Sequence, residues 1–114
     1  MFQIELYETA DGKVPVADFI NSLDTKTQSK LHKAIDILME RGHEAREPLT
    51  KSFGEGLFEL RALLSENNIR LIFFFHAGGT IVITNGFIKK TNKTPRREIS
   101  LAKKYRADWI KRNV

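Results

Sequence analysis

The chain has 114 residues, with 19 Lys and Arg against 14 Asp and Glu and a formal net charge of +5. This length suits one domain and excludes separate catalytic and regulatory domains. The absence of cysteine excludes a disulfide framework, a thiolate metal site and a cysteine nucleophile. We therefore expect a single domain over residues 1–114, held together by the packing of apolar side chains.

No stretch of the sequence predicts a membrane span. The longest apolar run is Leu71–Phe75, far short of the roughly 20 residues that cross a bilayer. The N-terminus also lacks the basic and apolar regions of a secretory signal. We expect a cytoplasmic protein without a membrane partner.

The positive charge is concentrated near the C-terminus. Residues 1–88 hold 9 Lys and Arg and 12 Asp and Glu, a net charge of −3, whereas residues 89–114 hold 10 and 2, a net charge of +8. Such a surplus indicates a polyanionic partner, either a nucleic acid or an anionic membrane surface. A solvated basic helix is the alternative explanation.

The N-terminal half predicts one strand and two helices. Residues 2–7 alternate apolar and polar side chains, which is typical of a half-buried strand. Pro15 suits the first turn of a short helix. Asp24 is expected to cap a second helix that ends at Gly42. Residues 43–56 show no hydrophobic period, and we interpret them as a connecting loop.

The C-terminal half predicts three strands and a helix. Residues 57–64, 69–76 and 80–87 are rich in β-branched and aromatic side chains and are separated by short turns, which predicts an antiparallel meander. Thr94 and Pro95 are expected to start the last helix. Its buried stripe comprises Ile99, Ala102, Tyr105 and Trp109. The predicted order is β-α-α-β-β-β-α, an α+β fold with helices on one face of an antiparallel sheet.

Two arginines of the meander are the first candidates for a functional site. The even-numbered side chains of residues 57–64 form an apolar face, so Glu59 and Arg61 point the other way. A hairpin register that places Arg70 near Arg61 would create a clamp for a phosphate, because a planar guanidinium matches two phosphate oxygens. The alternative for Arg61 is an ion pair with Glu59 on an exposed sheet.

The second candidate is the segment Gly86–Pro95, with the sequence GFIKKTNKTP. Lys89, Lys90 and Lys93 lie between the last strand and a helix N-terminus, where free backbone N–H groups already favour anions. Lysines in such a place can bind phosphates or take part in proton transfer. A solvated lysine loop is the alternative.

The histidines and carboxylates show no metal-binding pattern. His32, His43 and His76 lack ligand spacing, and neither an HExxH motif nor a phosphate-binding glycine loop is present. We expect no metal and no cofactor, and a site built from Arg, Lys and a carboxylate or histidine. His76 lies beside a glycine turn, where an ordinary exposed histidine is the simpler interpretation.

Three parts of the sequence together resemble a known toxin family. They are Leu57–Arg61 (LFELR), Arg70–Phe75 (RLIFFF) and the Gly86–Pro95 run followed by Glu98, Ile99 and Ala102. Over nearly its whole length the chain resembles the phage-derived, HigB-like branch of the RelE/ParE toxin superfamily. The resemblance implies the toxin of a type II toxin–antitoxin pair, with a sheet backed by helices.

The resemblance also implies an activity, which is metal-free cleavage of ribosome-bound mRNA by attack of the RNA 2′-hydroxyl on the adjacent phosphate. The protein would orient this attack and stabilise the charge on the phosphate and the leaving oxygen. A ParE-like toxin that poisons DNA gyrase by binding is the alternative, because the fold is shared. The implied partners are the ribosome, its mRNA and a cognate antitoxin, an acidic or helix-turn-helix protein encoded nearby that forms a hetero-oligomer with the toxin.

Roles for individual residues follow from the resemblance. Arg61 would clamp the scissile phosphate and Arg70 would share its charge. Backbone phosphates would be bound by Lys89, Lys90 and Lys93, and RNA outside the site would contact Arg96, Arg97, Lys103 and Lys104. Some relatives use a tyrosine or histidine near the C-terminus for proton transfer, but Tyr105 falls on the buried stripe. The group that accepts the 2′-hydroxyl proton stays open among the lysines, His76 and Glu59.

Overall fold

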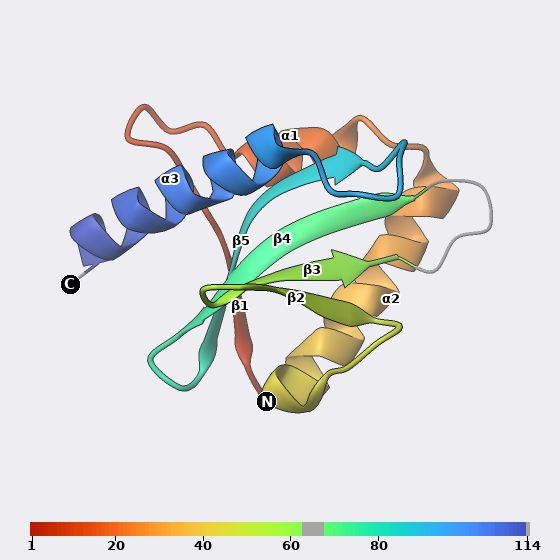
Figure 1. Ribbon diagram of the computed structural model, residues 1–114, viewed down its shortest axis with the longest axis horizontal. Coiled ribbons are helices and arrows are strands. Elements are labelled where there is room, and N and C mark those ends of the chain that lie inside the picture. The colour runs from red at the N-terminus through yellow and green to blue at the C-terminus, as the bar shows by residue number, and fades with distance from the viewer. Residues whose placement is uncertain (63–67, 114) are drawn as a thin grey trace.

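A five-stranded sheet organises the chain (Figure 1). The computed structural model describes residues 1–62 and 68–113. In chain order the elements are β1 (Gln3–Leu6), α1 (Pro15–Asn21), α2 (Thr25–Arg41), a 3-10 turn (Gly42–Glu44), β2 (Thr50–Gly54), β3 (Leu57–Arg61), β4 (Ile69–His76), β5 (Thr80–Ile88) and α3 (Arg96–Asn113).

The strands lie in the order β1-β5-β4-β3-β2. The predicted meander is confirmed, because β3, β4 and β5 pair antiparallel with their neighbours in sequence. The first strand pairs parallel with β5, which places the N-terminal segment beside the last strand. The predicted α+β class is therefore confirmed, in a sheet that is antiparallel except at its β1 edge.

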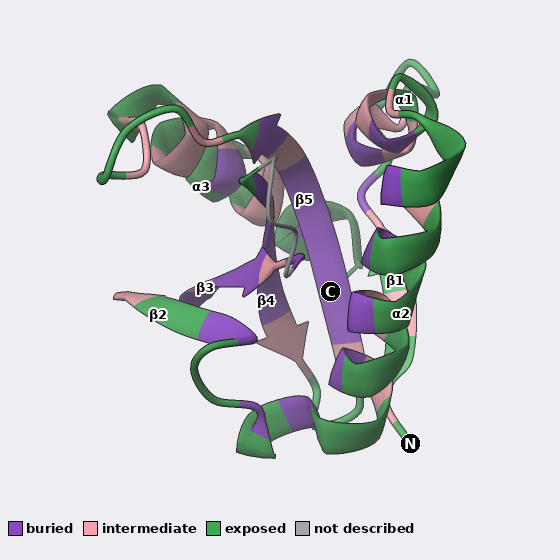
Figure 2. Cartoon of the chain, turned by 90° about the vertical axis from the view of Figure 1, so that its right-hand side faces the viewer, coloured by how far each residue is buried: buried purple, intermediate pink, exposed green. Residues whose placement is uncertain are grey.

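Helices cover both faces of the sheet. The helices α1 and α2 lie on one face and α3 lies on the other (Figure 2). The prediction that all helices pack on one face was wrong. The reason is visible in β4, where Leu71, Ile72, Phe73 and Phe74 are all buried, so that side chains of both parities need a cover.

The segment 43–56 contains an edge strand, so its interpretation as a loop was wrong. β2 pairs antiparallel with β3, with an irregular register between Ser52 and Gly54. Lys51 and Ser52 are exposed, which removes the apolar alternation expected of a strand. The strand expected over residues 57–64 has its C-terminal end within residues 63–67, which lie outside the described residues. Most of the turn expected after that strand lies there too.

The helix ends largely follow their sequence signals. An oxygen of the Asp24 side chain accepts a hydrogen bond from Thr27 N at 2.7 Å, which caps α2 as predicted. The helix ends at Arg41 with Gly42 as its C-cap, as predicted. Gly42 has a φ of 53°, which favours glycine, and the Phe2 ring leaves no room for a Cβ there. At the start of α3, Pro95 O accepts the backbone N–H of Glu98 at 3.0 Å, so Pro95 lies just before the first turn and not within it.

Two apolar cores result. The α1–α2 core lies between these helices and the sheet and includes Val16, Ile20, Leu31, Leu38, Leu60, Leu71, Phe73 and Ile83. The α3 core lies on the other face and comprises Tyr7, Leu57, Ile72, Phe74, Val82, Phe87, Ala102 and Trp109, with Phe53, Ile99 and Tyr105 packed against it. The predicted stripe of the last helix is thus confirmed. Among the described helices, none combines the length and apolarity needed to cross a membrane.

Candidate functional site

The strand register brings the two candidate arginines together. Arg61 of β3 and Arg70 of β4 are directly paired across the antiparallel ladder. Glu59 lies two residues before Arg61, so all three side chains belong to the face of the sheet that α3 covers. Two guanidinium groups side by side repel each other unless anions lie nearby.

A buried carboxylate supplies part of that negative charge. Glu59 is fully buried, with Arg70 Nε 2.5 Å and Lys89 Nζ 3.9 Å from its Oε1. The contact with Arg70 is an ion pair without hydrogen-bond alignment, since neither Glu59 oxygen has a hydrogen-bond partner among the described groups. We call Glu59, Arg70 and Lys89 the Glu59 cluster. Because a buried carboxylate is costly without cations beside it, Glu59 holds these two cations in place.

Arg61 has a different partner from the one that the exposed-sheet alternative assumed. Its Nη1 lies 3.3 Å from Glu47 Oε1, and the Glu47 side chain is 67% exposed. The Nε of Arg61 is buried without a hydrogen-bond partner in the described structure. The pairing of Arg61 with a solvated carboxylate is weak, so its guanidinium can exchange Glu47 for another anion.

A cavity of about 190 Å³ opens above the Glu59 cluster. Glu59 and Lys89 belong to its lining, together with Lys51 and Phe53 of β2, residues 92–94 and Ile99 of α3. Lys51 is the direct cross-strand partner of Glu59. Sequence reasoning missed Lys51, because its place depends on the pairing of an edge strand that has no apolar period.

The three lysines of the GFIKKTNKTP run occupy different environments. Lys89 extends the pairing of β5, since its backbone N–H donates to Asn68 O at 2.7 Å, and its side chain is only 10% exposed. Lys90 and Lys93 are exposed. Only Lys89 is therefore part of the buried cluster, whereas Lys93 contributes to the rim of the cavity.

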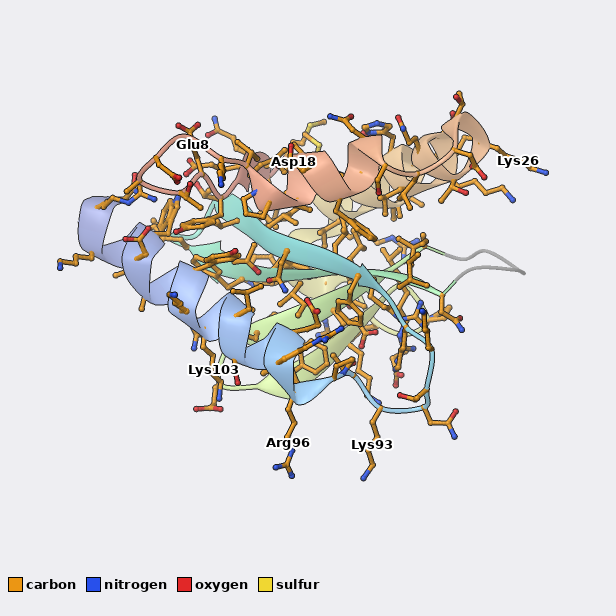
Figure 3. All side chains as sticks on the ribbon, turned by 90° about the horizontal axis from the view of Figure 1, so that it is seen from above. Glu8, Asp18, Lys26, Lys93, Arg96 and Lys103 are labelled. Atoms are coloured by element: carbon orange, nitrogen blue, oxygen red, sulfur yellow. The ribbon has the colours of Figure 1, made fainter. Side chains whose placement is uncertain are left out.

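Five basic side chains of α3 and of the segment just before it are exposed to solvent. Lys93, Arg96 and Lys103 project from the same side of the molecule, away from α1 (Figure 3). Arg97 and Lys104 are also exposed, and Lys103 donates to Glu55 Oε2 at 2.7 Å. We call these five residues, Lys93, Arg96, Arg97, Lys103 and Lys104, the α3 ridge.

A buried asparagine fixes the start of α3 relative to the sheet. The Nδ2 of Asn85 in β5 donates to Glu98 O at 3.2 Å and to Glu98 Oε1 at 3.1 Å. The hydroxyl of Thr84 donates to the Asn85 side chain at 2.7 Å. These bonds hold the two ends of the lysine segment together. The sequence signal for this role is the adjacent polar pair Thr84 and Asn85 within the otherwise largely apolar strand β5.

His76 and Tyr105 lie apart from the Glu59 cluster. His76 is four residues along β4 from Ile72, the cross-strand partner of Glu59, which corresponds to about 13 Å. Its ring packs against Trp109 at 4.7 Å between centroids. Tyr105 stacks on Tyr7 at 4.4 Å, in keeping with its place on the buried stripe.

The C-terminal part of α3 is tied to the segment around β1. The Tyr7 hydroxyl donates to Asp108 Oδ2 at 2.6 Å, and Arg112 Nη2 donates to the same oxygen at 2.8 Å. The Trp109 indole N–H donates to Glu5. We call these five residues the α3 latch. The pKa of Tyr7 is raised, mainly by burial and to a lesser extent by its hydrogen bond to Asp108. The pKa of Asp108 is lowered by the hydrogen bonds that it accepts from Tyr7 and Arg112.

The arrangement can bind an oxyanion such as a phosphate. Lys51, Lys89 and Lys93 line the cavity, as does Glu59, the partner of Arg70, whereas Arg61 and Arg70 are not among the lining residues. Lysine and arginine are the side chains that bind phosphate oxygens most strongly. Within the described ranges, no three His, Cys, Asp or Glu side chains gather into a group that could hold a metal ion.

Comparison with known proteins assigns the chain to a family. A search of curated proteins found no match. The family model of the phage-derived Gp49-like proteins (DUF891) matches residues 18–107, which include the Glu59 cluster, Arg61 and the lysine segment. The chain therefore belongs to the phage-derived Gp49-like (DUF891) family, a RelE-like toxin family.

Proposed function

We propose that this protein is the toxin of a type II toxin–antitoxin pair, of the HigB-like branch, and that it cleaves mRNA on the ribosome. The observation that carries the proposal is the cation-lined cavity above the Glu59 cluster. Lys51, Lys89 and Lys93 line it together with the buried Glu59, and Arg70 is paired with that carboxylate. This net positive charge in a partly dry site favours a phosphate more strongly than solvated charges would.

Each cation has a role that follows from its burial. Arg61 clamps the non-bridging oxygens of the scissile phosphate when it exchanges Glu47 for that anion. Arg70 and Lys89, held by Glu59, stabilise the charge that develops on the phosphate without having to reorganise. The exposed lysines Lys90 and Lys93 bind neighbouring backbone phosphates, and Lys51 contacts the substrate from the β2 side of the cavity.

The proposed reaction is an internal transfer within the RNA. The 2′-oxygen attacks the adjacent phosphorus, the bond from phosphorus to the 5′-oxygen breaks, and the products are a 2′,3′-cyclic phosphate and a 5′-hydroxyl. One group accepts the 2′-hydroxyl proton and another donates a proton to the leaving oxygen. Glu59 is buried beneath the cations, and His76 lies about 13 Å along β4 from Ile72, the cross-strand partner of Glu59. A charged lysine donates a proton and cannot accept one, so we assign protonation of the leaving 5′-oxygen to Lys89 or Lys93, and the 2′-hydroxyl proton passes to water.

The wider surface suits the proposed partners. The α3 ridge offers phosphate contacts for message or ribosomal RNA beyond the cleaved bond (Figure 3). Binding through such contacts weakens steeply with rising salt, because each neutralised phosphate releases counterions. A cognate antitoxin encoded beside the toxin would complete the pair, and the site of action would be the cytoplasm.

Replacement of Arg61 tests the proposal. Arg61→Ala should lower the rate of cleavage of ribosome-bound message by about 100-fold to 1000-fold, the usual effect of losing one charge-stabilising group. Lys13→Ala removes a cation from the exposed loop before α1 and serves as the control. Circular dichroism should show that both variants fold. Cleavage by Arg61→Ala at the parental rate would contradict the site.

The gyrase alternative predicts different products. After induction of the chain in cells, message ends should be mapped while DNA supercoiling and gyrase-linked DNA breaks are assayed. The ribonuclease proposal predicts new message ends and normal supercoiling. Intact messages together with accumulated gyrase-linked breaks would overturn it.

A further inference from the structure

A second cavity lies beside the edge strand β2, and we call it the β2 cavity. Its volume is about 580 Å³, within the range of about 300 to 1000 Å³ that is usual for sites of small ligands. The residues of its lining include His43, Arg46, Thr50, Lys51, Ser52 and Phe58. Of these six, the proposed reaction uses only Lys51.

Two aromatic residues of this lining have their rings in one cluster. The His43 ring packs on the Phe75 ring at 3.9 Å between centroids, and the Phe58 ring lies 5.4 Å from the same ring. His43 is exposed and Phe58 is half-buried. An exposed ring that is held by other rings is a surface on which a planar ligand can stack, and RNA bases stack on His and Phe side chains.

Two cations accompany these rings. Arg46 and Lys51 are exposed, and neither forms an ion pair with any residue of the described ranges. The Nη1 of Arg46 donates to His43 O at 2.6 Å and to Ala45 O at 2.9 Å. These bonds hold the Arg46 guanidinium against the segment that carries the His43 ring. The cavity thus combines an aromatic surface with positive charge.

Lys51 connects the β2 cavity to the proposed active site, because it belongs to the lining of both cavities. Side chains alternate along a strand, so Thr50 and Ser52 face the opposite side of the sheet from Lys51. Phe58 is the cross-strand partner of Ser52 and packs against the α1–α2 core. The two cavities therefore lie on opposite faces of the sheet at its β2 edge. One RNA strand that passes around this edge can enter both.

We propose that the β2 cavity binds the base of a nucleotide that neighbours the cleaved bond of the message. The base would stack on the His43 ring beside the Arg46 guanidinium, and Lys51 would bind the phosphate that joins this nucleotide to the cleaved one. A lone phosphate would need only the cations, whereas rings beside cations fit a ligand with both an aromatic plane and negative charge. The inference rests on the proposed function, because it extends the substrate of that reaction.

Short RNA analogues that cannot be cleaved test this binding apart from the reaction. The probe is a labelled single-stranded tetranucleotide with 2′-O-methyl riboses, which has no 2′-hydroxyl to attack. Four further analogues each lack one base. Fluorescence anisotropy with the full chain should show that loss of one particular base weakens binding by about tenfold, the usual contribution of a base stacked on an aromatic side chain. No detectable binding of the intact probe, or no penalty for any missing base, would overturn the proposal.

Variants of His43 locate the base. His43→Ala removes the stacking surface, so the penalty for the missing base should fall to within about twofold, whereas His43→Phe keeps a ring and should retain the penalty. His32→Ala removes an exposed histidine of α2 that lines neither cavity, and it should keep the full penalty. Circular dichroism should show that all three variants fold. A penalty unchanged in His43→Ala, or lost equally in His32→Ala, would overturn the proposal.

The charge beside the ring is tested in the same assay. Arg46→Gln should weaken binding of the intact probe by about threefold to tenfold, because a charge-assisted contact is lost. Lys13→Gln removes an exposed cation outside both cavities and should leave the affinity within about twofold of the parent. Equal effects of the two substitutions would show binding by net charge alone and would overturn the proposal.

Two further readouts separate the ligand class and the proposed function. Adenosine 5′-monophosphate should displace the labelled probe, and N-acetyltryptophanamide at the same concentration should not. Equal displacement by both would indicate a site for aromatic side chains and overturn the proposal. Base-dependent binding through His43 by a chain that cleaves no ribosome-bound message would overturn the proposed function and leave the base site intact. Cleavage by the parent without any base penalty would overturn this inference alone.

Discussion

The two faces of the sheet differ in what they bury. The face under α1 and α2 is filled by aliphatic side chains and Phe73, and its buried polar side chains among the described residues, Thr27 and Thr50, carry no charge. The face under α3 buries Glu59, Thr84 and Asn85 among its apolar residues and places Arg70 and Lys89 at its end. Apolar packing stabilises the fold but does not require a particular orientation of the side chains. Buried charged groups cost stability unless their partners are held in defined positions. We infer that packing on the α1–α2 face supplies most of the stability of the fold, and that the α3 face carries the candidate site.

The same contrast runs along α3. Its N-terminal half carries exposed cations next to the cavity, and its C-terminal half is fastened to the β1 segment by the α3 latch. The helix thus presents its basic side chains from a fixed support. A support of this kind is what preorganised contacts to a phosphate backbone require.

The largest effect on stability is expected in the α1–α2 core. Leu38 is fully buried on α2, and Leu38→Ala should lower the free energy of unfolding by about 3 kcal/mol through lost burial and the remaining cavity. Urea denaturation measures this change. At a concentration of urea where the variant is fully folded, its cleavage rate should equal that of the parent. A loss of cleavage without a loss of stability would contradict the division between the faces.

The Glu59 cluster should lose both stability and activity when its carboxylate is neutralised. Glu59→Gln keeps the size of the side chain but leaves Arg70 and Lys89 without a counter-charge, so we expect a loss of about 2 kcal/mol in unfolding free energy. Cleavage should fall because both cations lose their fixed positions. Glu47→Gln is the matched control for stability, since the exposed pair with Arg61 should contribute less than about 1 kcal/mol. Equal destabilisation by both variants would contradict the role assigned to Glu59.

The α3 latch should contribute a smaller amount. Tyr7→Phe removes one hydrogen bond to Asp108, with an expected cost of about 1 kcal/mol. Tyr105→Phe is the control, because Tyr105 packs on Tyr7 through its ring. Thermal unfolding of both variants tests this, and a larger effect at Tyr105 than at Tyr7 would reject the latch.

The pH dependence of the latch gives the finest distinction. The pKa of Asp108 is lowered in the folded state by the hydrogen bonds from Tyr7 and Arg112, so its contribution is present above the ordinary Asp range and is lost as the pH falls through the lowered pKa. The pKa of Tyr7 is raised chiefly by burial, so its contribution is lost as the pH rises through the raised pKa. The melting temperatures of the parent and of Asp108→Asn, measured as a function of pH, should converge at low pH. A difference in melting temperature that stays constant over the acid range would show that the ionised Asp108 side chain does not stabilise the fold.

The elements that could be predicted from the sequence are those set by local signals. The Asp24 cap, the meander and the buried stripe of α3 depend on side-chain periods and on turn or capping residues. The edge strand β2 could not be predicted, because an exposed strand on the rim of a sheet has no apolar period. The covering of both faces has a local signal, because the unbroken apolar run Leu71–Phe75 places apolar side chains on both faces of β4. That run does not determine which helix covers which face.

The candidate site was predicted in part for the same reason. The sequence indicated that a hairpin could bring Arg70 near Arg61 but left the register open, and the structure pairs the two residues. The partners of these arginines depend on non-local packing, so the Glu59–Arg70 and Arg61–Glu47 contacts were not foreseen. Lys51 was missed together with β2. The separation of buried Lys89 from exposed Lys90 and Lys93 follows from strand pairing that extends one residue beyond β5.

The most direct test of the central claim concerns the chemistry of the cleaved RNA. Purified protein is incubated with ribosomes that carry either an all-ribose message or the same message with a 2′-deoxyribose at the cleaved nucleotide. The account predicts a 2′,3′-cyclic phosphate and a 5′-hydroxyl from the first message and no cleavage at that position in the second. Cleavage of the deoxy-substituted message at the parental rate would contradict 2′-hydroxyl attack at this site.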